Sequence, residues 1–127
     1  MVDKILADTS ILIDLQKGEE KTIKNFDKFK NRISISRITV CEFIYGAKNK
    51  KEKKINKEFI EKLEVIEISE EISKYTYFLL DKYAQAVKLG IADALIASTA
   101  IIEGLSFWTL NIKHFRKIKE LKIYELK

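Results

Sequence analysis

Three carboxylates are the side chains of this chain best suited to chemistry: Asp8, Glu42 and Asp93. Each begins or lies within an expected helix and has apolar neighbours. On a helix, the positions three and four residues away from Glu42 and from Asp93 hold no lysine or arginine that could form an ion pair. Converging carboxylates repel one another unless a cation lies between them. Because oxygen ligands without cysteine or histidine suit Mg²⁺ or Mn²⁺ rather than Zn²⁺, the pattern predicts a divalent-metal site for phosphoryl transfer.

Each carboxylate also has a structural interpretation that stays open when it is taken alone. Asp8 could cap the helix that follows it. Glu42 could be partly exposed at the edge of the sheet. Asp93 could interact favourably with the N-terminus of its helix, which contributes roughly 0.3–1 kcal/mol. The functional interpretation rests on finding all three in one chain.

The composition excludes several other kinds of catalytic site. One cysteine and one histidine cannot build a disulfide framework, a multi-cysteine zinc site or a pair of catalytic histidines. The four glycines are too far apart for a phosphate-binding glycine loop. A Ser-His-Asp triad would depend on His114 alone, and there is no nucleophile-elbow sequence. His114 could act as a general base, or it could be a lone surface histidine on a short helix. Of the kinds of catalysis considered, metal-dependent hydrolysis is the one that the composition does not exclude.

Short apolar runs that alternate with helical patterns predict about five strands separated by helices. The expected strands are 4–7, 33–35, 65–68, 105–109 and 123–126, and the expected helices are 9–17, 19–30, 36–47, 69–90, 91–103 and 113–118. Strand–helix–strand alternation implies right-handed crossovers and a parallel sheet covered on both faces. We therefore expect one domain over residues 1–127, a three-layer α/β/α sandwich with a mainly parallel, about five-stranded sheet. Ligands bind at the carboxyl ends of such strands, where Asp8 directly follows the first.

Four segments, in order, resemble the motifs of PIN domains, specifically the toxin ribonucleases of VapBC-type toxin–antitoxin pairs. They are ILADTSILID at 5–14, ISRITVCEFIYGA at 35–47, IADALIASTA at 91–100 and TLNIKHF at 109–115. The resemblance implies that Asp8, Glu42 and Asp93 are catalytic and bind the metal. It also implies that Thr9, Ser10 and Thr109 support the site. The fold it implies is the three-layer PIN architecture.

Asn111 departs from the pattern of many PIN nucleases, which place an aspartate at this position of the fourth motif. An amide can ligate a metal directly or through water but removes one charge, so occupancy by one or two metals stays open. The resemblance implies a Mg²⁺-dependent endoribonuclease, with Mn²⁺ possible. It further implies a cognate antitoxin that blocks the site and a toxin that forms a homodimer.

The net charge of +5, from 24 basic and 19 acidic residues, suits attraction to phosphates and equally suits a protein from a lysine-rich proteome. The candidate RNA-binding residues are Lys48, Lys50, Lys51 and Lys54, which equally suit a solvated helix face. The alternative function is a catalytically weak nucleic-acid-binding module that acts through a partner, and a DNA nuclease is a third possibility. Because there is no signal-peptide pattern and no apolar run of about 18 residues, we expect a cytoplasmic protein without membrane contact.

Overall fold

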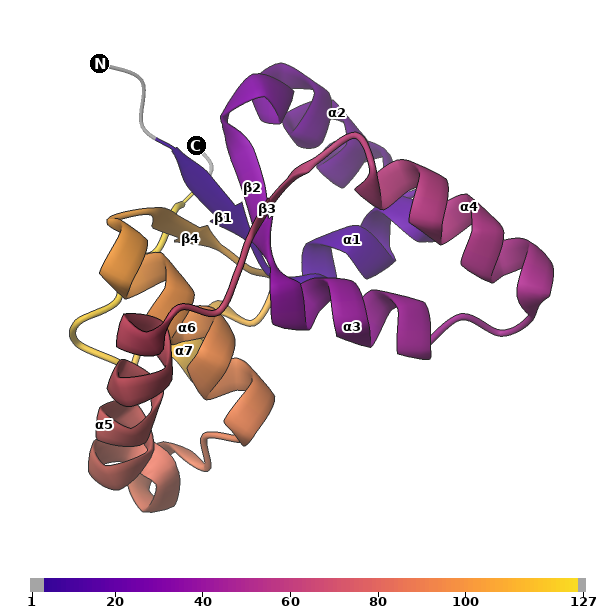
Figure 1. Cartoon of the computed structure of the whole chain (residues 1–127). Helices are drawn as coiled ribbons and strands as arrows, with labels where there is room; N and C mark the ends of the chain where they lie inside the picture. Colours follow the sequence, from indigo (N-terminus) through magenta and orange to yellow (C-terminus); the bar gives the residue numbers. More distant parts are fainter. Residues whose placement is uncertain (1–3, 126–127) are drawn as a thin grey trace.

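The computed structural model describes residues 4–125, and Figure 1 follows the order of its elements. Short strands alternate with helices along this part of the chain, as the apolar pattern predicts. The strands are β1 (Ile5–Ala7), β2 (Ile33–Ser36), β3 (Glu64–Ile66) and β4 (Ser106–Trp108). The helices are α1 (Thr9–Gln16), α2 (Glu20–Phe29), the 3₁₀ helix η1 (Lys30–Arg32), α3 (Arg37–Tyr45), α4 (Lys50–Ile60), α5 (Glu70–Val87), α6 (Ile91–Glu103) and α7 (Ile112–Phe115).

The strands lie parallel in the order β3-β2-β1-β4. Ile5 of β1 pairs with Ile33 of β2 on one side and with Ser106 of β4 on the other. The chain therefore builds the sheet outward from β1 through β2 to β3, and then crosses back to add β4 next to β1. In open parallel sheets this reversal leaves a crevice beyond the carboxyl ends of the two strands that flank it, here β1 and β4.

The expected fifth strand is wrong within the described residues, where the sheet has four strands. Ile123 forms a single parallel bridge with Phe107. Two backbone hydrogen bonds hold it: Phe107 N–H donates to the Lys122 carbonyl at 2.8 Å, and Tyr124 N–H donates to the Phe107 carbonyl at 2.7 Å. Pairing on the two sides of one residue is too short for a ladder, and Leu126, at the end of the expected strand, lies outside the described residues.

Alternate side chains of the strands face opposite sides of the sheet, which separates two apolar clusters. Leu6 and Phe107 face the side covered by α5, α6 and α7. Ile5, Ile35 and Trp108 face the other side, where α1, α2 and α4 pack. Figure 1 shows these two groups of helices on opposite sides of the sheet. The three-layer α/β/α arrangement is therefore confirmed.

Local side chains decide where the helices near the sheet begin and end. Ser36 is the N-cap of α3, as predicted, because its Oγ accepts a hydrogen bond from Thr39 N–H at 3.1 Å. Helix α5 ends at Val87, before the predicted Gly90, because Lys88 adopts the left-handed conformation with φ of 57°. Helix α6 has the predicted bounds. Within residues 4–125 there is no helix with the length and apolarity needed to cross a membrane.

Candidate functional site

Asp8 lies at the point where the strand order reverses. It directly follows β1, and its backbone N–H donates to the Trp108 carbonyl at the end of β4 at 2.9 Å. The carboxylate is almost fully buried, with 4% of the residue exposed. The crevice predicted from the strand order therefore has a buried acidic side chain at its base.

Three donors hold the Asp8 carboxylate in place. Oδ1 accepts from Thr9 N–H at 2.7 Å, so Asp8 does cap α1, the structural role that the sequence left open. Oδ2 accepts from Ser10 Oγ at 3.0 Å and from Thr109 Oγ1 at 2.7 Å. Ser10 Oγ accepts a hydrogen bond from Leu110 N–H, and Thr109 Oγ1 accepts one from Asn111 N–H. The protons of the two hydroxyls therefore point at Asp8.

The environment raises the pKa of Asp8 above its ordinary value of 3.8. Burial is the largest cause, because it removes the charged form from water. The hydrogen bonds from Thr109, Ser10 and Thr9 oppose it, and the negative charge of Asp93 raises the pKa further. Within residues 4–125 no lysine or arginine forms an ion pair with Asp8. Asp8 and Asp93 therefore repel each other, and no lysine or arginine among the described residues neutralises Asp8.

Replacing Asp8 with asparagine should remove a pH-dependent loss of stability from the metal-free protein. A raised folded pKa means that the folded state keeps its proton longer than the unfolded state, so stability falls as pH rises from 3.8 through the folded pKa. Asparagine cannot ionise, so it removes this loss, while its NH₂ group replaces the oxygen that accepts from Ser10 and Thr109. We expect the unfolding temperature of Asp8→Asn minus that of the wild type to increase from acid to neutral pH. Thermal unfolding in chelator across this pH range checks it, and a difference that decreases towards neutral pH would contradict the assignment.

Glu42 reaches the same site through a chain of hydroxyls. It lies half-buried on α3, and Thr9 Oγ1 donates to its Oε1 at 2.6 Å. The hydroxyls of Thr9 and Thr39 lie 3.1 Å apart, and Ser36 Oγ lies 3.2 Å from Thr39 Oγ1. Each hydroxyl has one proton, and the Thr9 proton is used in the hydrogen bond to Glu42. The hydrogen bond between the two threonines must therefore be donated by Thr39 and accepted by Thr9. Thr9 therefore joins the two carboxylates, with its N–H on Asp8 and its hydroxyl on Glu42.

Asp93 lies in the first turn of α6, with 41% of its side chain exposed. His114 Nε2 lies 3.3 Å from its Oδ2, at ion-pair distance but without the alignment of a hydrogen bond. The His114 ring also packs edge-on against Phe115. One interpretation of the sequence placed His114 at the surface; in the structure the histidine is half-buried against an acidic residue of the candidate site.

The residues around Asp8 suit a Mg²⁺ ion held by few protein ligands, rather than a metal site enclosed by several protein ligands. Among the described residues, no group of three or more His, Cys, Asp or Glu side chains is placed to hold an ion. Mg²⁺ is usually held by one or two carboxylates, with water and substrate phosphate completing its shell. Asp8 and Asp93 supply such a pair. The exposed Asn111 side chain does not cap α7 and lies beside Thr109, which its backbone N–H contacts.

The four candidate RNA-binding lysines occupy different places. Lys48 lines a cavity of about 380 Å³ together with Glu42 and Lys17. Lys51 lines a larger groove between α1 and α4. Lys50 and Lys54 are exposed on α4 away from both. Within the described part of the chain none of the four forms an ion pair.

Two features of the site are not visible in the sequence. The contact of His114 with Asp93 joins α7 to α6, and it depends on how both helices pack on the sheet. The hydroxyl chain from Ser36 to Glu42 has only a local signal, the capping serine three residues before Thr39. The link between Thr9 and Thr39 is purely tertiary.

Comparison with known proteins gives consistent matches over nearly the whole chain. The family model described as PIN domain matches residues 5–121. Ribonuclease VapC1 of Methanocaldococcus jannaschii is 39% identical over 96% of this chain and 88% of its own length. Ribonuclease VapC1 of Rickettsia felis is 34% identical over 94% and 93%.

Solved structures match this chain both in fold and in sequence. A toxin–antitoxin complex from Klebsiella pneumoniae contains a chain with a TM-score of 0.81 and 31% identity, covering 97% of this chain and 100% of its own. VapBC2 from Rickettsia felis, bound to a DNA fragment from its promoter, matches with a TM-score of 0.80 and 29% identity, over 97% of this chain and 98% of its own.

Proposed function

The chain belongs to the PIN-domain family, and from this membership we propose that it is a Mg²⁺-dependent endoribonuclease toxin of the VapC type. The observation that carries the proposal is Asp8, a buried carboxylate at the strand-order reversal, repelled by Asp93 and without a basic partner among the described residues. A buried charge of this kind costs free energy unless a cation neutralises it. The substrate class follows from the ribonuclease names of the relatives.

The side chains would divide the chemistry of phosphodiester hydrolysis among them. Asp8 and Asp93 would hold the ion, with Asn111 contributing directly or through water. When bound there, Mg²⁺ would supply positive charge against the phosphate oxygens and lower the cost of ionising the attacking water. Ser10 and Thr109 keep the Asp8 carboxylate in one orientation. Glu42 uses Oε1 to accept from Thr9, which leaves Oε2 to orient the attacking water.

The test is cleavage of purified structured RNAs by the purified protein in Mg²⁺, with and without EDTA. We expect cleavage at defined positions that EDTA abolishes and that added Mg²⁺ or Mn²⁺ restores. Cleavage that persists in EDTA would contradict the metal mechanism. RNA binding without cleavage would favour the second candidate, a nucleic-acid-binding module that acts through a partner. Asn111, which removes one negative charge from the candidate metal site, is the observation that favours that candidate.

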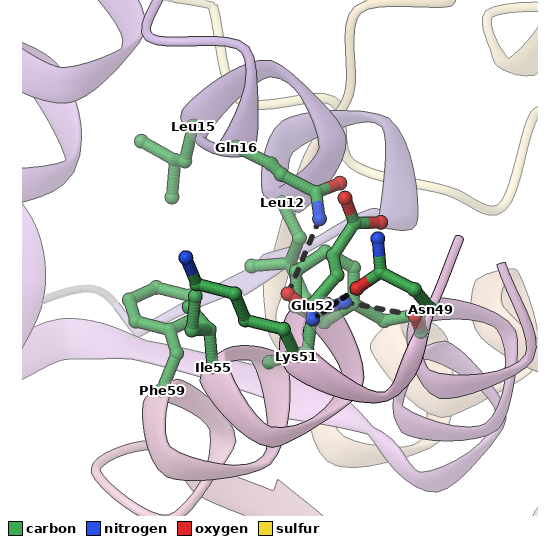
Figure 2. A pocket seen from close by; sticks show the side chains of 10 residues that line it. Leu12, Leu15, Gln16, Asn49, Lys51, Glu52, Ile55 and Phe59 are labelled. Atoms are coloured by element: carbon green, nitrogen blue, oxygen red, sulfur yellow. Dashed lines mark hydrogen bonds between the residues drawn. The ribbon is translucent and has the colours of Figure 1, made fainter. Parts of the chain in front are cut away.

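The proposal includes inhibition by a cognate antitoxin, since similar solved structures are toxin–antitoxin complexes. A groove of about 540 Å³ between α1 and α4 suits an antitoxin segment. Figure 2 shows Lys51, Ile55 and Phe59 along α4, opposite Leu12 and Leu15 of α1. The groove is mainly apolar, and its charged lining residues are one lysine and one glutamate, so the segment that fits it is an amphipathic one with an apolar face. We call it the α1–α4 groove.

Ile55→Glu should weaken inhibition by the antitoxin without slowing the free nuclease. Ile55 is 56% exposed and lines the α1–α4 groove, so the change places a charge at an apolar contact while leaving the core intact. We expect about tenfold or more loss of antitoxin affinity, measured by calorimetry. Ile68→Glu is the matched control, because Ile68 is 39% exposed and lies outside the groove. Equal effects of both variants would exclude the groove as the docking site.

We also propose that the toxin forms a homodimer. Exposed apolar side chains are present on α5 and α6, where Tyr77 is 76%, Phe78 43% and Ile91 69% exposed. Large exposed apolar side chains on neighbouring elements are typical of protein interfaces.

A further inference from the structure

A further cavity, of about 490 Å³, opens beside the carboxylate site on the other side of β4 from α6. Thr109 connects this cavity with the carboxylate site, because it lines the cavity and its Oγ1 donates to Asp8 Oδ2 at 2.7 Å. The remaining walls come from α2, which contributes Lys21 and Asn25, and from the segment after β4, which contributes Arg116 and Tyr124. We call it the α2–β4 pocket. A group held in it lies one hydroxyl away from the carboxylate that would hold the metal.

Two polar side chains of α2 line the pocket without a partner in the described chain. Lys21 forms no ion pair within residues 4–125, and its ammonium group is free to meet an anion. Asn25 is half-buried, and its amide makes no hydrogen bond with any described residue. A half-buried amide keeps both a donor and an acceptor available, which is the pattern needed to pair with a nucleobase edge.

The opposite wall is held in a fixed arrangement. Arg116 Nη2 donates to Glu125 Oε1 at 2.8 Å, which restricts the planar guanidinium at the rim. The Tyr124 ring packs edge-on against Phe29, with centroids 5.7 Å apart and an interplanar angle of 80°. Aromatic rings and guanidinium planes are the surfaces on which unpaired RNA bases stack.

We propose that the α2–β4 pocket binds the nucleotide next to the scissile phosphate and sets the cleavage preference of the enzyme. Lys21 contacts a backbone phosphate, Asn25 reads the base edge, and Tyr124 with Arg116 provides the stacking surface. This inference rests on the proposed ribonuclease function. The pocket is lined by Lys21, a free amide and an aromatic ring, and its one carboxylate, Glu125, is paired with Arg116. RNA is therefore favoured over an antitoxin segment, whereas the α1–α4 groove is mainly apolar.

The experiment compares the wild type with Asn25→Ala and Lys21→Ala on single-stranded RNAs randomised around the cleavage position, with products sequenced. Asn25→Ala should reduce the preference for one base at one flanking position by about 5- to 150-fold, the range for a bidentate base contact. Lys21→Ala should raise KM equally for all sequences, leave kcat within about twofold, and flatten the log–log salt dependence of RNA binding by about 0.7, as for one phosphate of a single strand. Asn31→Ala and Lys24→Ala are the matched controls, since neither residue lines the pocket.

Measuring RNA binding without cleavage distinguishes failure of this inference from failure of the proposed function. The same RNAs are titrated, by fluorescence anisotropy, into these variants made in an Asp8→Asn background, where no cleavage is needed. Loss of affinity or base preference in Asn25→Ala and Lys21→Ala, but not in the controls, supports the pocket even if the wild type does not cleave RNA. Unchanged preference, salt dependence and affinity in folded variants, or weakened antitoxin binding with RNA binding intact, would overturn it.

Discussion

Replacing Asp8 with asparagine is expected to slow Mg²⁺-dependent RNA cleavage by about 10³-fold, the scale on which a single group that organises charge in the transition state contributes. Asparagine keeps the shape of the side chain and an oxygen for Thr9 N–H, and the hydroxyls of Ser10 and Thr109 can rotate to accept from its NH₂ group, so the fold should persist. It removes the negative charge that would bind the ion. Single-turnover cleavage of an RNA substrate at saturating Mg²⁺ measures the effect.

Two further variants make this result specific. Asp93→Asn should also strongly reduce the cleavage rate, because Asp93 is the second carboxylate of the proposed pair. Asp81→Asn, the same substitution at an exposed position on α5, should leave the rate unchanged. If Asp8→Asn cleaves RNA at the wild-type rate, Asp8 does not hold a catalytic ion. A melting temperature at or above the wild-type value excludes unfolding as the cause of lost activity.

Phe107→Ala should have the largest effect on stability, about 3–5 kcal/mol in the free energy of unfolding. Phe107 lies in β4 and is fully buried. Its ring packs at 4.8 Å, edge-on, against Phe115 of α7, the helix that carries His114. Removing the ring leaves a cavity between the sheet and α7. Urea denaturation measures the change.

Tyr45→Ala is the control for the loss of an aromatic side chain. Tyr45 is 94% exposed, so truncation should change the free energy of unfolding by no more than about 0.5 kcal/mol. Losses of equal size in the two variants would contradict the burial assigned to Phe107.

The elements that carry the carboxylates could be predicted from the sequence because their signals are local. The apolar run before Asp8 ends at a capping aspartate, and α6 is bounded by Gly90 and Gly104, the latter with φ of +67°. The last expected strand failed because an apolar pair such as Ile123–Tyr124 indicates burial but not how many residues will pair.

The contacts that make a site from these residues are tertiary and could not be predicted in the same way. Thr109 and Asp8 are far apart in sequence, and their hydrogen bond exists because β4 pairs with β1. The position of His114 against Asp93 and the pocket formed by Asn25 with Tyr124 likewise need the relative placement of helices. The resemblance to PIN domains indicated the candidate site residues, whereas the distances between their side chains depend on the fold.

The central claim is that Asp8 helps to hold a divalent cation, and metal-dependent thermal unfolding tests it most directly. A ligand that binds only the folded state raises the unfolding temperature. At a Mg²⁺ or Mn²⁺ concentration that supports cleavage, the unfolding temperature of the wild type should rise relative to that in EDTA, and that of Asp8→Asn should not. An equal rise in both proteins, or none in the wild type, would contradict the account.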